Sequence, residues 1–183
     1  SRKVPFGRVL YIERDDFMEN PPKKFFRLSE GKEVRLRYGY FIKCVGIEKN
    51  PETGEVETVH CTYDPETRSG FAPDGRKVDA TIHWVSAAHA ILCEIRLYDR
   101  LFYVPDPLAE EAEYKTFLNP NSLEVVATGM VEPSLCNVTA GQHFQFERLG
   151  YFIVDFADAS QKRIVFNRTV TLRDSWAKNM VKK

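Results

Sequence analysis

The sequence has no long hydrophobic run, and no apolar stretch approaches the roughly 20 residues that a membrane-spanning helix needs. Its first residues, Ser1–Pro5, carry charges without an apolar segment behind them, so a secretory signal is not expected. Cysteine is scarce, and no two cysteines have the two-residue spacing of zinc ribbons and redox motifs. We expect a cytoplasmic protein without a membrane partner or a metal site. In it, Cys44, Cys61, Cys93 and Cys136 would be reduced and buried.

The sequence also lacks net charge: 26 Lys and Arg balance 26 Asp and Glu, so it is not strongly basic overall, as nucleic-acid-binding domains often are. The charge is unevenly distributed. Residues 1–43 carry 11 basic and 6 acidic side chains, residues 161–183 carry 7 and 1, and the segment between carries 8 and 19. If the two ends meet, they form one basic face that would attract a phosphate backbone. Clustering by chance is the alternative.

Most of the chain alternates apolar and polar residues with a period of two, which is typical of β-strands with one buried face. Turn residues such as Asn50–Gly54 and Pro73–Gly75 separate the alternating segments. The expected strands are 9–12, 33–37, 41–45, 56–60, 80–84, 94–98, 123–126, 144–148, 151–154 and 164–166. Many short strands at this spacing favour barrels or sandwiches.

One helix is expected, from Pro107 to about Leu118. Asp106 stands where an N-cap would, proline occupies the first helical position, and acidic residues fill the first turn. Asn119-Pro120 would end the helix. Such a segment would connect two strands.

A short internal repeat suggests two related domains. Arg37–Ile42 recurs 111 residues later as Arg148–Ile153, with five of six residues identical. This favours two copies of a small β-domain, each with an arginine-bearing strand, a glycine turn and an aromatic return strand. In a chain rich in Tyr, Phe and Arg, coincidence is the alternative.

Segments spread in order over nearly the whole chain resemble the C-terminal half of glutaminyl-tRNA synthetases. They are 31–37, 61–64, 74–78, 82–87, 94–102, 132–135, 144–148 and 166–170. The resemblance implies a mainly β fold of two tandem β-barrels, with one short helix or more between strands. Residues 1–85 and 163–183 would form the proximal anticodon-binding barrel, without its first strands, and 86–162 the distal anticodon-binding barrel. This arrangement would bring both basic ends together.

The resemblance further implies that the chain binds the tRNA(Gln) anticodon loop as a module of a monomeric glutamine–tRNA ligase, joined in cis to the rest of the synthetase. ATP and magnesium would bind the catalytic domain of that parent. The two-part ATP-binding signature of class I synthetases, a His-Ile-Gly-His-like turn and a Lys-Met-Ser-Lys-like loop, is absent from this sequence. We therefore expect no catalytic residue and no cofactor in the chain itself.

Arginine suits the reading of splayed bases, because its fork donates two hydrogen bonds at once and its plane can stack. Arg35 and Arg37 stand two residues apart on one side of an expected strand, about 6 to 7 Å from each other, near the spacing of one nucleotide. The matching positions in the family read the first anticodon base, and the position of Arg27 reads the third. Gln145 and Arg148 match positions that contact the second and third bases.

Lys24 aligns with a position that is glutamine in some members of the family and touches the middle base. Phe26 replaces a polar neighbour. A lysine can donate to a pyrimidine carbonyl but reads shape less strictly, so Lys24 is a weaker candidate. For every candidate the plain alternative is an exposed side chain that is solvated or paired with a carboxylate.

Other functions remain as alternatives. The chain could be a β-barrel that binds another structured RNA or acts as a spacer without anticodon specificity, or the equivalent region of a glutamyl-tRNA synthetase. Ser86 with His83 and His89 suggests a hydrolase, but no nucleophile elbow surrounds the serine. His60, Cys61 and His83 could be metal ligands, yet they lack a second spaced pair.

Overall fold

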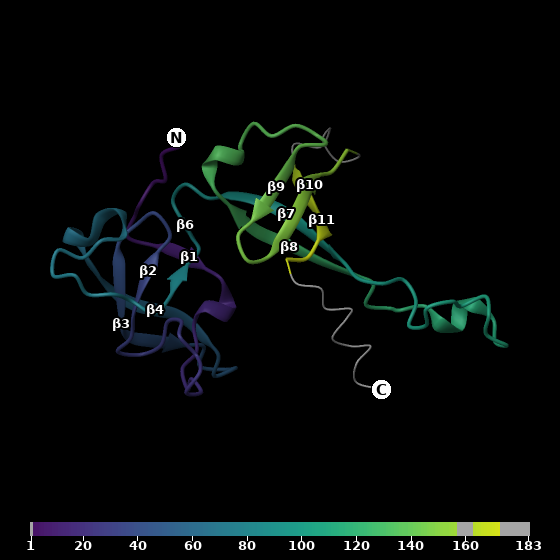
Figure 1. Ribbon diagram of the computed structural model, residues 1–183, viewed down its shortest axis with the longest axis horizontal. Helices are drawn as coiled ribbons and strands as arrows, with labels where there is room; N and C mark the ends of the chain where they lie inside the picture. Colours follow the sequence, from purple (N-terminus) through teal and green to yellow (C-terminus); the bar gives the residue numbers. More distant parts are fainter. Residues whose placement is uncertain (1, 157–162, 173–183) are drawn as a thin grey trace. The chain divides into compact units, whose positions relative to one another are not determined.

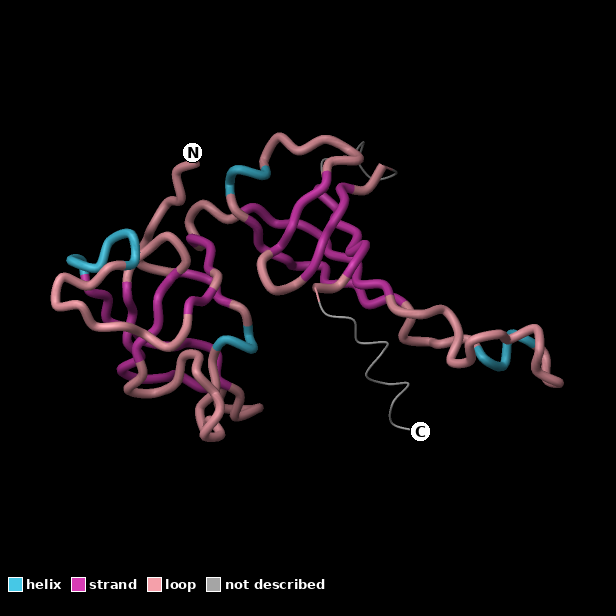
Figure 2. The backbone as a smooth tube through the Cα atoms, in the orientation of Figure 1, coloured by secondary structure: helices cyan, strands magenta, loops and turns pink. Residues whose placement is uncertain are grey.

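The computed structural model describes residues 2–156 and 163–172, which form β-strands joined by loops and short 3-10 helices (Figures 1 and 2). The chain divides into two compact units, Ser1–Ala90 and Ile91–Lys183. The described residues contain no α-helix, and no helix among them is long and apolar enough to cross a membrane. The prediction of a mainly β architecture is confirmed.

The first unit contains a four-stranded and a two-stranded sheet. Their strand orders are β4-β3-β2-β5 and β1-β6. The strands are β1 (Leu10–Ile12), β2 (Glu33–Leu36), β3 (Phe41–Lys49), β4 (Val56–Asp64), β5 (Thr81–Ile82) and β6 (Trp84–Ser86), with 3-10 helices η1 (Arg14–Asp16) and η2 (Pro65–Gly70). All pairs are antiparallel except β2 with β5. Because only His83 separates β5 from β6, the chain passes directly from one sheet to the other.

A small core beneath β2 holds the first unit together. Val34 and Leu36 alternate along β2 and are fully buried, together with Ile82 of the neighbouring β5. Trp84 is buried in the same cluster, and its Nε1 donates a hydrogen bond to the Arg37 carbonyl at 2.9 Å. The apolar residues of the alternating pattern predicted for β2 are therefore buried. Their packing, together with the Trp84 hydrogen bond, holds the C-terminal end of β2 in place.

A four-way arginine cluster ties the segment after β4 to this sheet. Arg76 Nε donates to Glu33 at 3.0 Å, and its Nη1 donates to Asp74 at 2.9 Å. Its Nη2 donates to Asp64, and the guanidinium lies 5.4 Å from the centroid of the Phe41 ring. Arg76 thus joins β2, β3, the end of β4 and the 73–76 turn.

The hydrogen bonds of Arg76 should lower the pKa values of two carboxyl groups. The Arg76 side chain lowers the pKa of the Asp64 carboxyl, and the Arg76 backbone N–H followed by its side chain lowers that of Asp74. Their contribution to stability is present above the ordinary pKa and is lost as the pH falls through the lowered values. Carboxyl carbon shifts followed by NMR should therefore place both pKa values below about 3.9, the usual value for Asp. In Arg76→Gln, the pKa values of Asp64 and Asp74 should return toward the usual value. Ordinary pKa values for both carboxyls in the wild type would contradict the hydrogen bonds of this cluster.

The second unit is built on a five-stranded sheet with the order β8-β7-β11-β10-β9. The elements are β7 (Ile91–Tyr98), η3 (Tyr114–Phe117), β8 (Leu123–Val131), η4 (Pro133–Leu135), β9 (His143–Phe146), β10 (Gly150–Val154) and β11 (Ile164–Val170). β7 and β11 are parallel, and the other pairs are antiparallel. Phe152 and Phe166 are buried in its core with Phe144 and Phe146 packed against them.

The last described strand corrects the predicted domain assignment. β11 pairs with β7 through Ile164–Asn167 and with β10, so it belongs to the second unit. The resemblance implied that residues 163–183 would join residues 1–85 in the first. The assignment was wrong for β11 because Phe166 is fully buried in the second core and the strand needs a partner on both edges there. Residues 173–183 lie outside the described residues.

The helix expected from Pro107 to Leu118 does not form. Asp106 does accept a hydrogen bond from the Leu108 N–H at 3.1 Å, as a cap would, but within residues 107–118 only Tyr114–Phe117 is helical, as a 3-10 turn. Leu108 is 82% exposed, and every residue of 108–116 is exposed, so this segment buries no apolar face. A helix of about 12 residues is marginal without such packing. Instead, residues 99–122 extend beyond the sheet as a long excursion between β7 and β8 (Figures 1 and 2).

The cysteines only partly match the prediction. All four are free thiols. Cys44 and Cys93 are buried, and burial raises the pKa of the Cys93 thiol to about 11. Cys61 and Cys136 are exposed, so the expectation of burial was wrong for these two.

Candidate nucleic-acid interface

The hairpin between β2 and β3 carries Arg35 and Arg37. Arg35 lies on β2 between the buried Val34 and Leu36, so its side chain leaves the strand on the face opposite the core. The Arg35 N–H donates to Ala80 O at 2.9 Å. The Arg37 N–H, one residue beyond the strand, donates to Ile82 O at 3.0 Å. The structure therefore brings the two predicted arginines together on a backbone that is hydrogen-bonded on both sides, although Arg37 belongs to the turn.

The Arg35 guanidinium has an unused donor. Its Nε is buried and has no hydrogen-bond acceptor within the described part of the chain. Leaving a buried donor unpaired costs roughly 1–3 kcal/mol, and more for a charged group. The sequence thus retains a charged group at a stability cost at this position, and a phosphate or base oxygen would supply the missing acceptor.

Tyr38 and Arg37 share the turn that follows β2. The turn closes with a hydrogen bond from the Gly39 N–H to Leu36 O at 2.8 Å, and Tyr38 has a φ of 60°. A left-handed backbone costs an L-residue about 1–2 kcal/mol. The Arg37 guanidinium lies 4.9 Å from the Tyr38 ring centroid and that of Arg2 lies 5.7 Å from it, within the range of cation–π contacts.

The second unit repeats this turn between β9 and β10. The Leu149 N–H donates to Phe146 O at 3.0 Å, and Arg148 has a φ of 65°. Gln145 is exposed on β9, opposite Tyr151 of β10, which is 45% exposed. Gln145 and Arg148 are therefore brought together at one hairpin, on the second unit.

The sequence repeat is one residue out of step with the structural repeat. By its hydrogen bonds and backbone angle, Tyr38 corresponds to Arg148, whereas the sequence repeat aligned Arg148 with Arg37. The two phenylalanines it aligned also differ, since Phe152 belongs to the core cluster of its unit whereas Phe41 lies under Arg76. Side chains alternate between faces along a strand, so a shift of one residue reverses them. Two copies of a hairpin are present, but their equivalent positions differ from those predicted.

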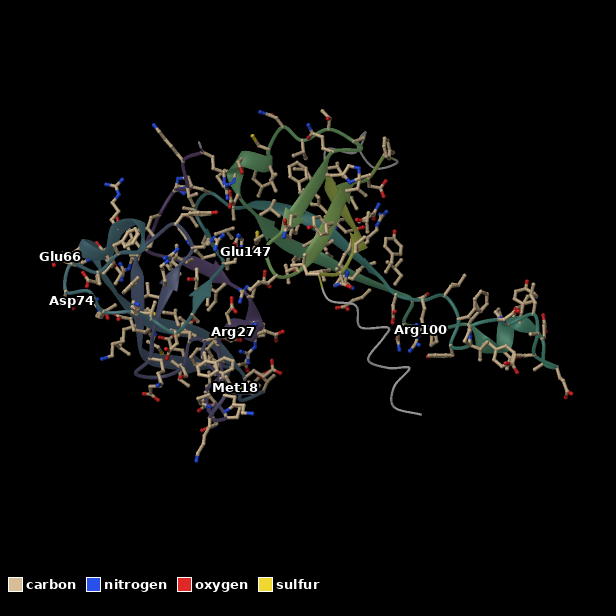
Figure 3. All side chains as sticks on the ribbon, in the orientation of Figure 1. Met18, Arg27, Glu66, Asp74, Arg100 and Glu147 are labelled. Carbon is tan, nitrogen blue, oxygen red and sulfur yellow. The ribbon has the colours of Figure 1, made fainter. Side chains whose placement is uncertain are left out.

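Arg27 has a partner of its own, as the plain alternative expected. Its Nη1 donates to Asp15 O at 3.0 Å, and its Nε lies 3.4 Å from a carboxylate oxygen of Asp16, which is fully buried. The Arg27 side chain is still 39% exposed and lines a hollow of about 570 Å³. That hollow is lined by Arg14, Asp15, Phe17, Met18, Glu19, Phe25, Arg27, Gly54, Glu55 and Val56; Figure 3 labels Arg27 and Met18.

Lys24 lies in the loop that leads to Arg27. It is exposed and has no hydrogen bond or ion pair to another described residue. Phe26, two residues on, is 59% exposed. Lys24 is therefore available to a ligand, but nothing in its surroundings orients it.

The hydrolase alternative does not fit the structure. Ser86 is only 2% exposed, and its Oγ lies 3.0 Å from His89 Nδ1. The Ser86 carbonyl also accepts the N–H of His89, so this pair closes a turn. A buried hydroxyl in that setting cannot reach a substrate carbonyl.

Within residues 2–156 and 163–172, no three His, Cys, Asp or Glu side chains gather as metal ligands. His60, one of the weighed ligands, is instead 2.8 Å from the Glu48 carboxylate.

Sequence comparison identifies the class of domain that these hairpins belong to. Two family models match the chain, one over residues 1–64 and the other over 81–155. Both carry the description "tRNA synthetases class I (E and Q), anti-codon binding domain". Each match includes one of the arginine-bearing hairpins.

Curated relatives are similar to the chain over nearly its whole length. The glutamine–tRNA ligase of Bradyrhizobium diazoefficiens is 55% identical over 182 residues, covering 100% of this chain and 32% of the relative. That of Nitrobacter hamburgensis is 58% identical over 178 residues, covering 97% and 31%, and that of Escherichia coli O157:H7 is 53% identical, covering 97% and 32%. The chain thus belongs to the anticodon-binding domains of class I tRNA synthetases (E and Q), is similar to these glutamine–tRNA ligases, and spans about a third of their length.

Sequence reasoning missed Tyr38. Its backbone angle and its contact with Arg37 are tertiary features. A tyrosine next to a glycine at the end of an arginine-bearing strand was visible, but tyrosines of this kind more often belong to a core.

Proposed function

We propose that this chain reads the anticodon loop of tRNA(Gln) as part of a glutamine–tRNA ligase that acts as a monomer. Catalysis would take place elsewhere in that protein, where ATP and magnesium bind. The observation that carries the proposal is the buried Arg35 Nε, which has no acceptor among the described residues, on a hairpin whose turn contains Arg37. The family of the chain supports the nature of the ligand.

Anticodon reading needs unstacked bases to meet donors of matching geometry. In the proposed complex, Arg35 and Arg37 contact the first anticodon base and its phosphate, because both residues lie on the hairpin between β2 and β3, two positions apart. Gln145 and Arg148 contact the second and third bases from the hairpin of the second unit. Arg27 contributes to the third base through the nitrogen atoms that Asp15 and Asp16 leave available, and the exposed Lys24 contacts the middle base.

A binding titration tests the proposal. The chain is titrated with an anticodon stem-loop carrying CUG and with one whose middle U is replaced, each at two salt concentrations. We expect the replacement to weaken binding by roughly 1–3 kcal/mol, about 5- to 150-fold, the usual cost of a lost base contact. Arg148→Ala should reduce this discrimination, whereas Lys115→Ala, an exposed residue of the second unit paired with Glu113, should leave it unchanged.

The alternative makes the opposite prediction. A β-module that only holds phosphates would bind both stem-loops equally, with an affinity that falls steeply with salt. Equal binding that Arg148→Ala does not alter would therefore refute anticodon reading by this chain.

A further inference from the structure

Tyr38 combines two features that its position alone does not require. It is 60% exposed, so its ring is not needed for the core. It also has a φ of 60° at the third position of a tight turn, where glycine or asparagine is usual. An exposed aromatic residue held in this conformation by a well-ordered hairpin points to a functional constraint.

The ring contacts an arginine of the proposed site. The Arg37 guanidinium lies 4.9 Å from the ring centroid, and the two residues are neighbours in the same turn. The backbone of Arg37 is fixed independently, because its N–H donates to Ile82 O and its carbonyl accepts from Trp84 Nε1. The tyrosine ring therefore adds a constraint at the far end of the Arg37 side chain, where the backbone bonds cannot act.

The second unit supports the importance of this turn position. Arg148 occupies the corresponding place, with the same closing hydrogen bond and a φ of 65°. In the proposed function Arg148 is itself a base contact. The positive-φ position of each hairpin turn is thus exposed and carries a group suited to RNA in both units, an arginine in one and an aromatic ring in the other.

We propose that Tyr38 is a positioning residue for RNA reading, and this inference rests on the proposed function. Its ring holds the Arg37 guanidinium before RNA binds, so that the arginine fork faces the first anticodon base. A long side chain that is already ordered loses less conformational entropy on binding. Tyr38 would therefore act through Arg37, and its removal would matter only when Arg37 is present.

A double-mutant cycle tests this dependence. Tyr38→Asn removes the ring but suits a positive φ, Tyr38→Phe keeps the ring, and both are combined with Arg37→Ala. The readout is the affinity for the CUG stem-loop and for one with its first base replaced. We expect Tyr38→Asn to weaken binding of CUG about three- to tenfold and to reduce first-base discrimination, in line with a cation–π contact. Tyr38→Phe should bind as the wild type does.

In the Arg37→Ala background, Tyr38→Asn should have no further effect. Additive losses, or a Tyr38→Phe variant as weak as Tyr38→Asn, would overturn the inference. Thermal unfolding of each variant, with Tyr38→Gly as a second ring-free variant, checks that the turn still folds. If the wild type ignores the anticodon, the proposed function fails; if it discriminates but the cycle is additive, only the role of Tyr38 fails.

Discussion

Replacing Phe166 by alanine should lower the free energy of unfolding of the second unit by about 3–5 kcal/mol. The side chain is fully buried on β11, which lies between β7 and β10 in the middle of the sheet. Its ring centroid lies 5.0 Å from that of Phe146 and 6.0 Å from that of Phe144, both in edge-on geometry. Alanine would leave a cavity between these rings and weaken the strand that joins the two halves of the sheet.

Urea unfolding followed by far-UV circular dichroism measures this loss. Phe71→Ala is a matched control, because Phe71 is 80% exposed and its removal should change stability by less than about 0.5 kcal/mol. In a Trp176→Phe background the buried Trp84 reports on the first unit alone, and its transition should change less than that of the second unit. An unaltered midpoint for Phe166→Ala would mean that β11 does not belong to this core.

The sequence predicts the strands well because a strand with one buried face leaves a local pattern. Each of the ten expected segments overlaps a strand, and the main differences are in length: β3, β4 and β8 each run to nine residues. The pattern does not reveal which strand is the neighbour. β11 reads as a strand from its own residues, but its parallel pairing with β7 depends on the second core, about 70 positions away along the chain.

The failed helix shows the same limit. The capping residue Asp106 and the proline after it are correct local signals, and Asp106 does cap a turn. Whether a turn grows into a helix depends on an apolar face that finds a partner. Leu108 finds none, and this cannot be read from the local sequence.

The candidate site was only partly predictable. The placement of Arg35 and Arg37 on one strand followed from the strand period and the family resemblance, but in the structure only Arg35 lies on β2 and Arg37 is the first residue beyond it. The partner of Arg27 was not predictable, because Asp16 reaches it across a loop and is buried by the fold. The role inferred for Tyr38 depends on a backbone angle that no residue pattern specifies.

Arg35 should separate the reading of bases from the attraction of phosphates. Lysine at this position keeps the charge but loses the planar fork and the Nε donor. We expect Arg35→Lys to lower first-base discrimination by roughly 1–3 kcal/mol, about 5- to 150-fold, while the dependence of affinity on salt stays as in the wild type. Arg35→Ala should lose the same discrimination and also reduce the slope of log affinity against log salt by about 0.7, the value for one single-strand phosphate contact.

Stability and binding should change independently in these variants. Because the buried Arg35 Nε has no acceptor among residues 2–156 and 163–172, Arg35→Ala removes a donor that these residues leave unpaired and should leave the unfolding midpoint unchanged or raise it. Arg68→Ala, the loss of an exposed arginine in η2, controls for charge alone. A lower midpoint with weaker binding would make Arg35 a structural residue. The proposed role instead requires that Arg35→Ala weakens binding at an unchanged unfolding midpoint, and that Arg35→Lys keeps the wild-type salt dependence but not the discrimination between first bases. That result would mean that the Arg35 guanidinium is kept on this hairpin because the RNA supplies its missing acceptor.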